Sequence, residues 1–201
     1  MMGARKISVV LGGALLVVSQ AACGVEGSGN IVSEVRDVTG FDSIDVSAGI
    51  DVDVSVGDDA DHSVTVNYDD NVLDKLVTDV SGGTLVVKFN GSVRLSGSNL
   101  DRVVTVVMPR LEALEASGGA DIIARGPADR LDIQASGGAS INTADLLAVD
   151  VTVDVSGGAS VRMFAGGSVT GDASGGASVD VIGSPGVLDV DTSGGASVSS
   201  R

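Results

Sequence analysis

The sequence predicts an all-β protein, a single-stranded β-solenoid whose coils of about 19 residues stack on one another. The main observation is a short phrase, Ser-Gly-Gly-Ala-Ser or a close variant, that recurs through the second half of the chain. The five copies begin at Ser117, Ser136, Ser156, Ser174 and Ser193, with spacings of 19, 20, 18 and 19 residues. A solenoid coil cannot bury its apolar face alone, so a repeat of this length predicts stacking on further copies.

Apolar and polar residues alternate on both sides of each phrase, which is typical of strands with one buried face. Before the first Ser, the apolar columns lie five, three and one residues back. One of them contains Leu114, Ile133, Val153, Gly171 and Val190. After the glycines, an Ala column is followed by Ile122, Ile141, Val161, Val179 and Val198. The Gly-Gly pair therefore lies at a corner between two strands, where residues without a Cβ can turn the chain sharply.

The first half follows the same plan less regularly. Residues 41–56 alternate in the same way around a corner at Ser47, Ala48, Gly49 and Ile50, and a second variant of the phrase begins at Ser81. We expect one solenoid domain over residues 31–201, with irregular N-terminal coils over 31–110 and regular coils over 111–201. First coils of a solenoid are commonly atypical because they cap the stack.

The first 22 residues have the features of a lipoprotein signal peptide rather than of the fold. Arg5 and Lys6 precede an apolar stretch, residues 7–18, and small residues lead to Cys23, the only cysteine. The apolar stretch is too short to span a membrane. We expect lipidation at Cys23 and a short flexible tether over the Gly- and Ser-rich residues 23–30. An ordinary secretory signal with a spare cysteine is the alternative.

Charge and composition exclude several classes of function. The chain has 12 Lys and Arg residues against 27 Asp and Glu, and loss of Arg5 and Lys6 with the signal peptide gives a net charge of about −17. Such a surface repels nucleic acid, so we expect no nucleic-acid partner. No Trp and one Tyr are present, whereas sugar-binding subsites of polysaccharide enzymes use aromatic platforms.

Three blocks resemble the bacterial auto-transporter adhesin head domain family called head GIN. They are FDSIDVSAGIDVDV from Phe41, VSGGTLVVK from Val80 and MPRLEALEASGG from Met108. The resemblance covers roughly residues 35–199. It implies a right-handed parallel β-helix on an exported, often lipid-anchored protein, and it brings no catalytic residues.

Two kinds of site residue follow from these patterns. Cys23 is the lipidation site. The solvent-facing column two residues before each phrase is acidic except at Gln134, and it contains Glu115, Asp154, Asp172 and Asp191. Carboxylates stacked in this way form a possible weak cation-binding column for Ca²⁺, although a solvated acidic face that keeps the protein soluble is the favoured interpretation. We expect no cofactor and no confident metal site.

The sequence thus predicts a non-enzymatic, lipid-anchored module of the cell envelope that faces the periplasm or the cell exterior. It would bind or display like an adhesin, with an envelope protein or a glycan as partner and the membrane contacted through the lipid. Two alternatives stay open. One is a polysaccharide-active β-helix enzyme, for which Arg125, Arg130 and Arg162 would have to meet paired carboxylates. The other is a structural protein that self-associates through the open C-terminal coil.

Overall fold

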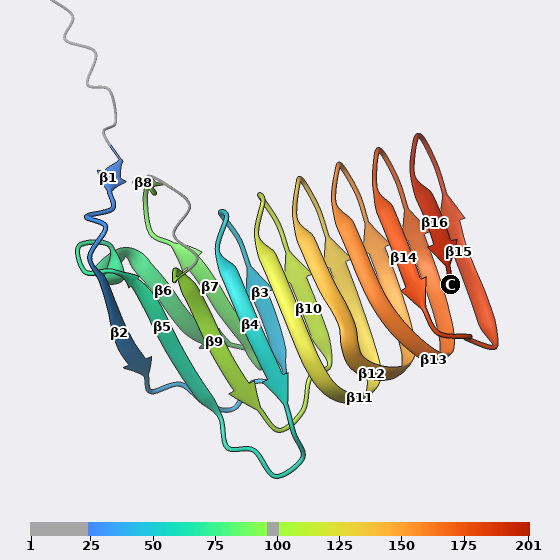
Figure 1. Ribbon diagram of the computed structural model, residues 1–201, viewed down its shortest axis with the longest axis horizontal. Helices are drawn as coiled ribbons and strands as arrows, with labels where there is room; N and C mark the ends of the chain where they lie inside the picture. The colour runs from blue at the N-terminus through green and yellow to red at the C-terminus, as the bar shows by residue number, and fades with distance from the viewer. Residues whose placement is uncertain (1–23, 96–100) are drawn as a thin grey trace, which may run out of the picture.

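Two faces of one large β-sheet enclose the core of this computed structural model, which describes residues 24–95 and 101–201 (Figure 1). The sheet contains 14 strands, and a separate two-stranded sheet lies near the N-terminus. The described elements, in chain order, are β1 (Val25–Glu26), β2 (Ile31–Arg36), β3 (Ser43–Val46), β4 (Asp51–Val56), β5 (Ser63–Asp69), the 3-10 turn η1 (Leu73–Lys75), β6 (Leu76–Ser81), β7 (Thr84–Phe89), β8 (Val93–Arg94), β9 (Val103–Met108), β10 (Ala113–Ala116), β11 (Asp121–Ala135), β12 (Ser140–Val155), β13 (Ser160–Ala173), β14 (Ser178–Ile182), β15 (Val187–Thr192) and β16 (Ser197–Ser200).

Long bent strands join the two faces along one edge. β12 pairs with β11 on one side and β13 on the other. The first half of β11 pairs with β4 and its second half with β10, while the first half of β13 pairs with β14 and its second half with β15. We call the side with β3, β10 and β15 face 1 and the side with β4, β14 and β16 face 2. The Ser-Gly-Gly-Ala turns join the faces along the opposite edge, which we call the turn ridge. One pass across face 1, the ridge and face 2 is a tier.

Equivalent positions of successive repeats pair with each other in the second half of the chain. Leu114 pairs with Ile133, Ile133 with Val153, and Val153 with Gly171. The inward columns are buried, as the alternation predicts, and they build one continuous core of aliphatic side chains. Burial of each such side chain contributes about 1.5–3 kcal/mol, so the stack does not depend on aromatic residues.

The predicted fold class, a right-handed parallel β-helix over residues 31–201, is wrong. The strands form one mixed sheet that folds back on itself and nearly closes around the core. Three pairs are antiparallel, namely β2 with β5, β5 with β9, and β6 with β7. The Ser81–Thr84 phrase, expected as a coil corner, is instead the turn of the β6–β7 hairpin. Gly82 and Gly83 both have positive φ there, as a two-residue hairpin turn requires.

Strand order in space also departs from chain order in the first half. The tier of β3 and β4 lies between the tier of β7 and β9 and the tier that begins with β10. The chain therefore starts at the outer edge of the sheet with β2, enters the stack at β3 and β4, builds outward again through β5 to β7, and returns to the other side of β3 at β10. Without a repeat in this region, alternation fixes which side chains are buried but not which strands become neighbours.

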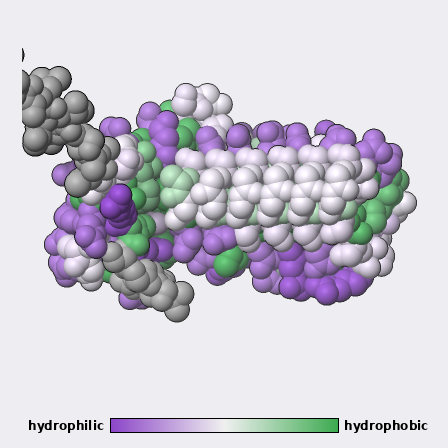
Figure 2. Space-filling view, turned by 90° about the horizontal axis from the view of Figure 1, so that it is seen from above, coloured by the Kyte–Doolittle hydropathy of each residue, from purple (hydrophilic) through white to green (hydrophobic). Residues whose placement is uncertain are grey.

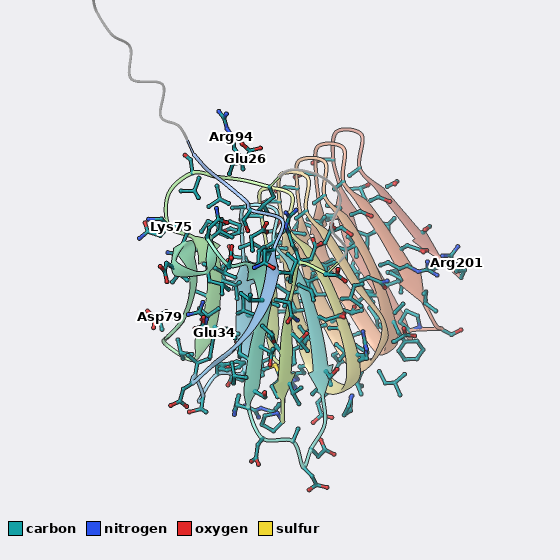
Figure 3. All side chains as sticks on the ribbon, turned by 60° about the vertical axis from the view of Figure 1, so that its left-hand side comes forward. Glu26, Glu34, Lys75, Asp79, Arg94 and Arg201 are labelled. Atoms are coloured by element: carbon teal, nitrogen blue, oxygen red, sulfur yellow. The ribbon has the colours of Figure 1, made fainter. Side chains whose placement is uncertain are left out.

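Residues 24–30, expected as a flexible tether, are bonded to the domain. β1 pairs with β8. Ser28 Oγ donates to Asp70 Oδ1 at 2.6 Å, and Asn30 Nδ2 donates to Asp70 Oδ2 at 2.9 Å. Figure 3 shows Glu26 and Arg94 at the end of the molecule where the described chain begins, with Arg201 at the far end. The signal peptide and Cys23 lie outside the described residues, which contain no helix long and apolar enough to cross a membrane.

A buried ion pair holds this end of the molecule together. Arg102 Nε donates to Asp69 Oδ2 at 2.6 Å, and Arg102 Nη2 donates to Asp69 Oδ1 at 3.0 Å. Asp69 Oδ1 also accepts the backbone N–H of Gly29 at 2.5 Å. The hydrogen bonds from Arg102 are the main cause that lowers the pKa of Asp69, against the opposing effect of burial. Asp69 thus ties the N-terminal segment to β5 and to the start of β9.

The turn ridge brings backbones of neighbouring tiers unusually close. The N–H of Gly158 donates to the carbonyl of Gly137 at 2.7 Å, and the N–H of Gly176 donates to that of Gly157 at 2.6 Å. Gly157 has φ +71°, and a Cβ there would lie 3.0 Å from the N and O atoms of Gly137. Glycine is therefore required both by the turn and by the spacing of the tiers.

We expect opposite effects from two substitutions at the same point of the ridge. Ala48 has φ 66°, a left-handed conformation that costs an L-residue free energy, so Ala48→Gly should raise the free energy of unfolding by about 0.5–1 kcal/mol. Gly157→Ala should lower it by about 1–3 kcal/mol. Gly138→Ala is the control, because a Cβ there meets open space, and it should change stability by less than about 0.5 kcal/mol. Urea unfolding measures all three, and equal effects at 138 and 157 would contradict the role of the close approach.

The buried ion pair should be far more sensitive than an exposed one. Asp69→Asn removes the buried carboxylate that Arg102 bonds through both Nε and Nη2, and it should cost about 3–5 kcal/mol in the free energy of unfolding. The control is Asp53→Asn, which breaks the exposed pair with Arg125 at 3.0 Å and should cost less than about 1 kcal/mol.

The same pair gives a pH dependence of defined sign. Because the folded-state pKa of Asp69 is lowered, its contribution is present above the ordinary carboxyl pKa of about 3.9 and is lost as the pH falls through the folded-state value. The difference in stability between the native chain and Asp69→Asn should therefore shrink in acid. A difference that stays constant from neutral pH to well below about pH 4 would contradict this account.

Candidate binding surface

The predicted acidic column is a real row on face 1. Glu115 pairs with Gln134, Gln134 with Asp154, Asp154 with Asp172, and Asp172 with Asp191. Strand pairing thus aligns all four predicted carboxylates, with Gln134 interrupting them. These side chains are exposed, and neighbouring strands lie about 4.8 Å apart. Two unit charges at that spacing repel by about 0.9 kcal/mol in water, so the row favours cationic groups.

Asp45 extends this row by one tier and was not predicted. It pairs with Glu115, and the pKa of Glu115 is raised by burial and by the charge of Asp45. The sequence does contain the pattern that would have identified Asp45. It stands two residues before Ser47, and the four predicted carboxylates stand two residues before the first Ser of their repeats. We call Asp45, Glu115, Asp154, Asp172 and Asp191 the acidic row.

The acidic row does not form a chelating cage. In the described ranges, 24–95 and 101–201, no group of three or more His, Cys, Asp or Glu side chains is arranged to hold a metal ion. Side chains on adjacent strands project side by side rather than converging. The arrangement suits a partner with several positive charges at strand spacing better than a single enclosed cation.

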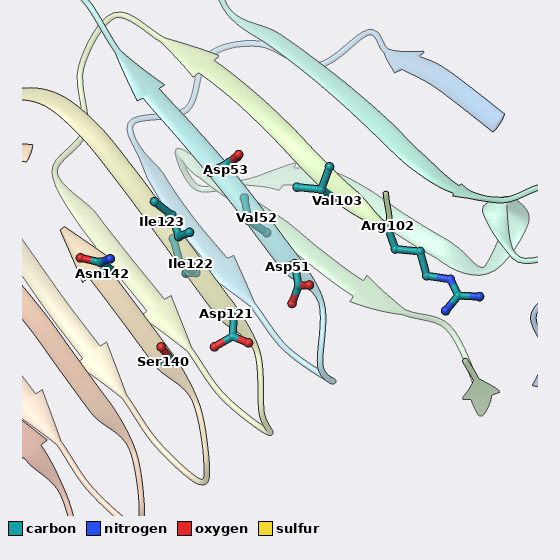
Figure 4. A pocket seen from close by; sticks show the side chains of 10 residues that line it. All are labelled: Asp51, Val52, Asp53, Arg102, Val103, Asp121, Ile122, Ile123, Ser140 and Asn142. Carbon is teal, nitrogen blue, oxygen red and sulfur yellow. The ribbon is translucent and has the colours of Figure 1, made fainter. Parts of the chain in front are cut away.

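Face 2 carries a shallow hollow of about 340 Å³ near the N-terminal end (Figure 4). Asp51 and Asp121 lie next to each other on it, because β4 pairs with β11. Burial and the charge of Asp121 raise the pKa of Asp51. Arg102 also lines the hollow, but Figure 4 shows its guanidinium directed away from both carboxylates, toward its bond with Asp69.

Tyr68 lies beneath this region and is a core residue. It is almost completely buried, and its ring makes an edge contact with Phe89 at 5.8 Å between centroids. Burial, with a smaller contribution from the charge of Asp51, raises the pKa of Tyr68 to about 12. The phenol therefore stays protonated at neutral pH and does not act as a base.

The bent edge contains a groove that brings an arginine and carboxylates together, the arrangement that an enzyme would need. Its volume is about 550 Å³, and Arg130, Glu112 and Asp150 line it. Both carboxylates are engaged within the chain, because Arg110 lies 2.5 Å from Glu112 and Ser168 Oγ donates to Asp150 at 2.6 Å. This geometry describes side chains that stabilise the edge rather than an acid–base pair.

The remaining candidates for chemistry also have structural partners. Arg125 pairs with Asp53 at 3.0 Å, and Arg162 lies 3.7 Å from Asp180. His62, the only histidine, is half-buried. Its Nε2 donates to the carbonyl of Phe41 at 2.7 Å, and its ring contacts that of Phe41 at 4.5 Å. A histidine held in this way fastens the loop after β4 to the core.

Comparison with solved structures finds bacterial proteins that are similar to this chain. A "putative adhesin" from Bacteroides fragilis has a TM-score of 0.60 and 15% identity, covering 89% of this chain and 100% of its own. A "putative adhesin" from Parabacteroides merdae has a TM-score of 0.48 and 15% identity, covering 89% and 99%. A "putative lipid binding protein" from Parabacteroides distasonis has a TM-score of 0.47 and 16% identity, covering 89% and 100%. At these sequence identities the similarity concerns the fold alone. The argument for a shared fold rests on the Bacteroides fragilis structure, whose TM-score is 0.60.

No curated protein matches the chain. A family model does match, over residues 40–127 and 115–185, and its description is "Putative auto-transporter adhesin, head GIN domain". These ranges contain all three blocks that carried the resemblance in the sequence, and they end before the last repeat. The chain belongs to the auto-transporter adhesin head GIN domain family.

Proposed function

We propose that this protein is a non-enzymatic, lipid-anchored module of the cell envelope that binds a cationic partner through face 1. The acidic row is the observation that carries the proposal. Its five carboxylates lie on paired strands whose backbone is fixed by ladder hydrogen bonds, so the binding surface is organised before the partner arrives. The adhesin description of the family supports a binding role.

The charge of the chain narrows the class of partner. A net charge of −15 before any processing attracts basic proteins and glycans that carry amino groups, and it repels nucleic acid and anionic lipid headgroups. Only the attached lipid would then hold the protein to a membrane. Ca²⁺ could also bridge the acidic row to an anionic partner. The predicted cation-binding column would then hold Ca²⁺ only together with that partner.

The position of the N-terminus suits such an anchor. Gly24, the residue after Cys23, lies at the end of the molecule formed by β1 and β8. Hydrogen bonds to Asp69, Asp70 and Asn71 hold residues 28–30 close to β5. A lipid on Cys23 would therefore leave only a short span of chain between membrane and domain. The stack of tiers would extend from there with face 1 exposed along its length.

Neutralising the acidic row should abolish most binding. We expect Glu115→Gln, Asp154→Asn, Asp172→Asn and Asp191→Asn together to weaken adhesion of protein-coated beads to envelope fractions or to polylysine by at least about tenfold, with the largest effect at low salt. The control variant changes Asp37, Asp58, Asp59 and Asp61 to Asn. It loses the same charge away from the row and should bind nearly as well. Equal losses in both variants would mean that net charge alone, and no defined surface, causes adhesion.

The lipid anchor is tested separately. Cys23→Ser removes the only thiol that can be acylated, so the protein should move from the membrane fraction to the soluble extracytoplasmic fraction while remaining exported. Fractionation with immunodetection measures this. Retention of the Cys23→Ser protein in the membrane fraction would show that something other than a lipid on this residue holds it there.

A further inference from the structure

The two ends of the core are built differently. At the N-terminal end, Val72 and Leu73 of the η1 region are buried over the last tier, and the Tyr68–Phe89 contact closes the interior. At the C-terminal end nothing among the described residues covers the last tier. Leu188 is 41% exposed, although the equivalent Val169, Val151 and Leu131 of earlier tiers are buried, and Val187 beside it is 50% exposed. Figure 2 shows hydrophobic surface at this end of the molecule.

The backbone is open at the same end. Among the described strands, β15 pairs only with β13, and β16 pairs only with β14. The outer edge of each strand therefore presents N–H and C=O groups that a further strand could bond. The two open edges lie side by side, one on each face, above a partly exposed core that includes Val190, Ala196 and Val198. We call this surface the C-terminal tip.

The charges on β15 and β16 determine which strand of a second copy can pair with their open edges. The solvent-facing side of β15 carries Asp189 and Asp191. Antiparallel pairing of β15 with β15 of a second copy puts aspartate opposite aspartate in each register that pairs most of the strand, which is unfavourable. The solvent-facing side of β16 carries Ser197 and Ser199 instead, and Arg201 follows, in contact with Asp180 at 2.5 Å. The tip thus contains one acidic edge and one neutral-to-basic edge.

We propose that a second copy of this chain docks tip to tip, with β15 of each copy pairing antiparallel to β16 of the other. The two-fold axis lies parallel to the strands, so the contact is made twice. In this register Asp191 lies opposite Ser197 of the second copy, and Asp189 lies opposite its Ser199. Val190 lies opposite Val198 on the buried side. The core, both faces and the turn ridge then continue across the interface.

The arrangement goes beyond the binding role of face 1, because the tip is the end of the stack and shares only Asp191 with the acidic row. It places the two N-terminal ends at opposite extremes of the pair. If Cys23 carries the proposed lipid, the two anchors therefore face away from each other, as they would on two apposed membranes. The tip-to-tip contact would then be a homotypic contact between cells.

Sedimentation of the purified Cys23→Ser chain over a wide concentration range tests this proposal. We expect a reversible monomer–dimer equilibrium. Ser197→Asp places a carboxylate opposite Asp191 of the second copy at both symmetric contacts, and it should lower the association constant about tenfold. The matched control is Ser160→Asp, at the equivalent exposed position of an inner tier, and it should leave association unchanged. Circular dichroism and thermal unfolding establish that both variants are folded.

The double variant Ser197→Asp with Asp191→Ser exchanges the two partners and should restore association to near the starting value. A strictly monomeric chain at all concentrations would overturn the proposal, as would equal effects of Ser197→Asp and Ser160→Asp. Stronger association of Asp191→Ser alone, with no effect of Ser197→Asp, would show that β15 pairs with β15 instead and would also overturn it. Ser197→Asp leaves the acidic row intact, so polylysine binding by this variant should be unchanged, and the two functions can fail separately.

Discussion

The close approach of glycine backbones along the turn ridge is the constraint on which the rest of the structure depends. Carbonyl and N–H groups of successive turns lie 2.6–2.7 Å apart at Gly137–Gly158 and Gly157–Gly176. That contact fixes how far one tier lies from the next and in which register the flanking strands meet. The apolar columns and the acidic row are both consequences of that register, because a shift by one residue would exchange the buried and exposed sets. A side chain on the first glycine would separate the tiers.

Where the sequence repeats, much of this could be predicted, including the paired columns and four members of the acidic row. The fifth, Asp45, was predictable from its offset before Ser47 and was overlooked because its tier lacks a Gly-Gly pair. The first half of the chain, where the sequence does not repeat, was harder to predict. The buried Val64, Val66, Val104 and Val106 occupy alternate positions of strands, but alternation carries no information on strand direction or neighbours. The predicted fold class was wrong because β5 and β6 pair antiparallel to their neighbours.

Long-range polar contacts explain the other departures. The Asp69–Arg102 pair joins residues 33 positions apart, and nothing in the local sequence distinguishes Asp69 from the exposed Asp70 beside it. The N-terminal segment looked like a tether because its Gly, Ser and Asn residues have no apolar periodicity. Its order depends on side-chain acceptors from Asp69, Asp70 and Asn71. Such acceptors become visible only when β2 and β5 are known to be neighbours.

The different construction of the two ends decides what size of assembly is possible. If both ends exposed an open core and free strand edges, tip contacts could repeat along the axis, and the chain would form fibres. At the N-terminal end β2 pairs only with β5 and β6 pairs only with β7 among the described strands, but the buried Val72 and Leu73 close the core there, so that end lacks the exposed apolar surface of the C-terminal tip. A two-fold contact at that tip uses up both open edges at once, because β15 and β16 of each copy are filled by the other. Assembly through this surface therefore stops at two copies, because each copy has a single such tip and the contact fills both of its open edges.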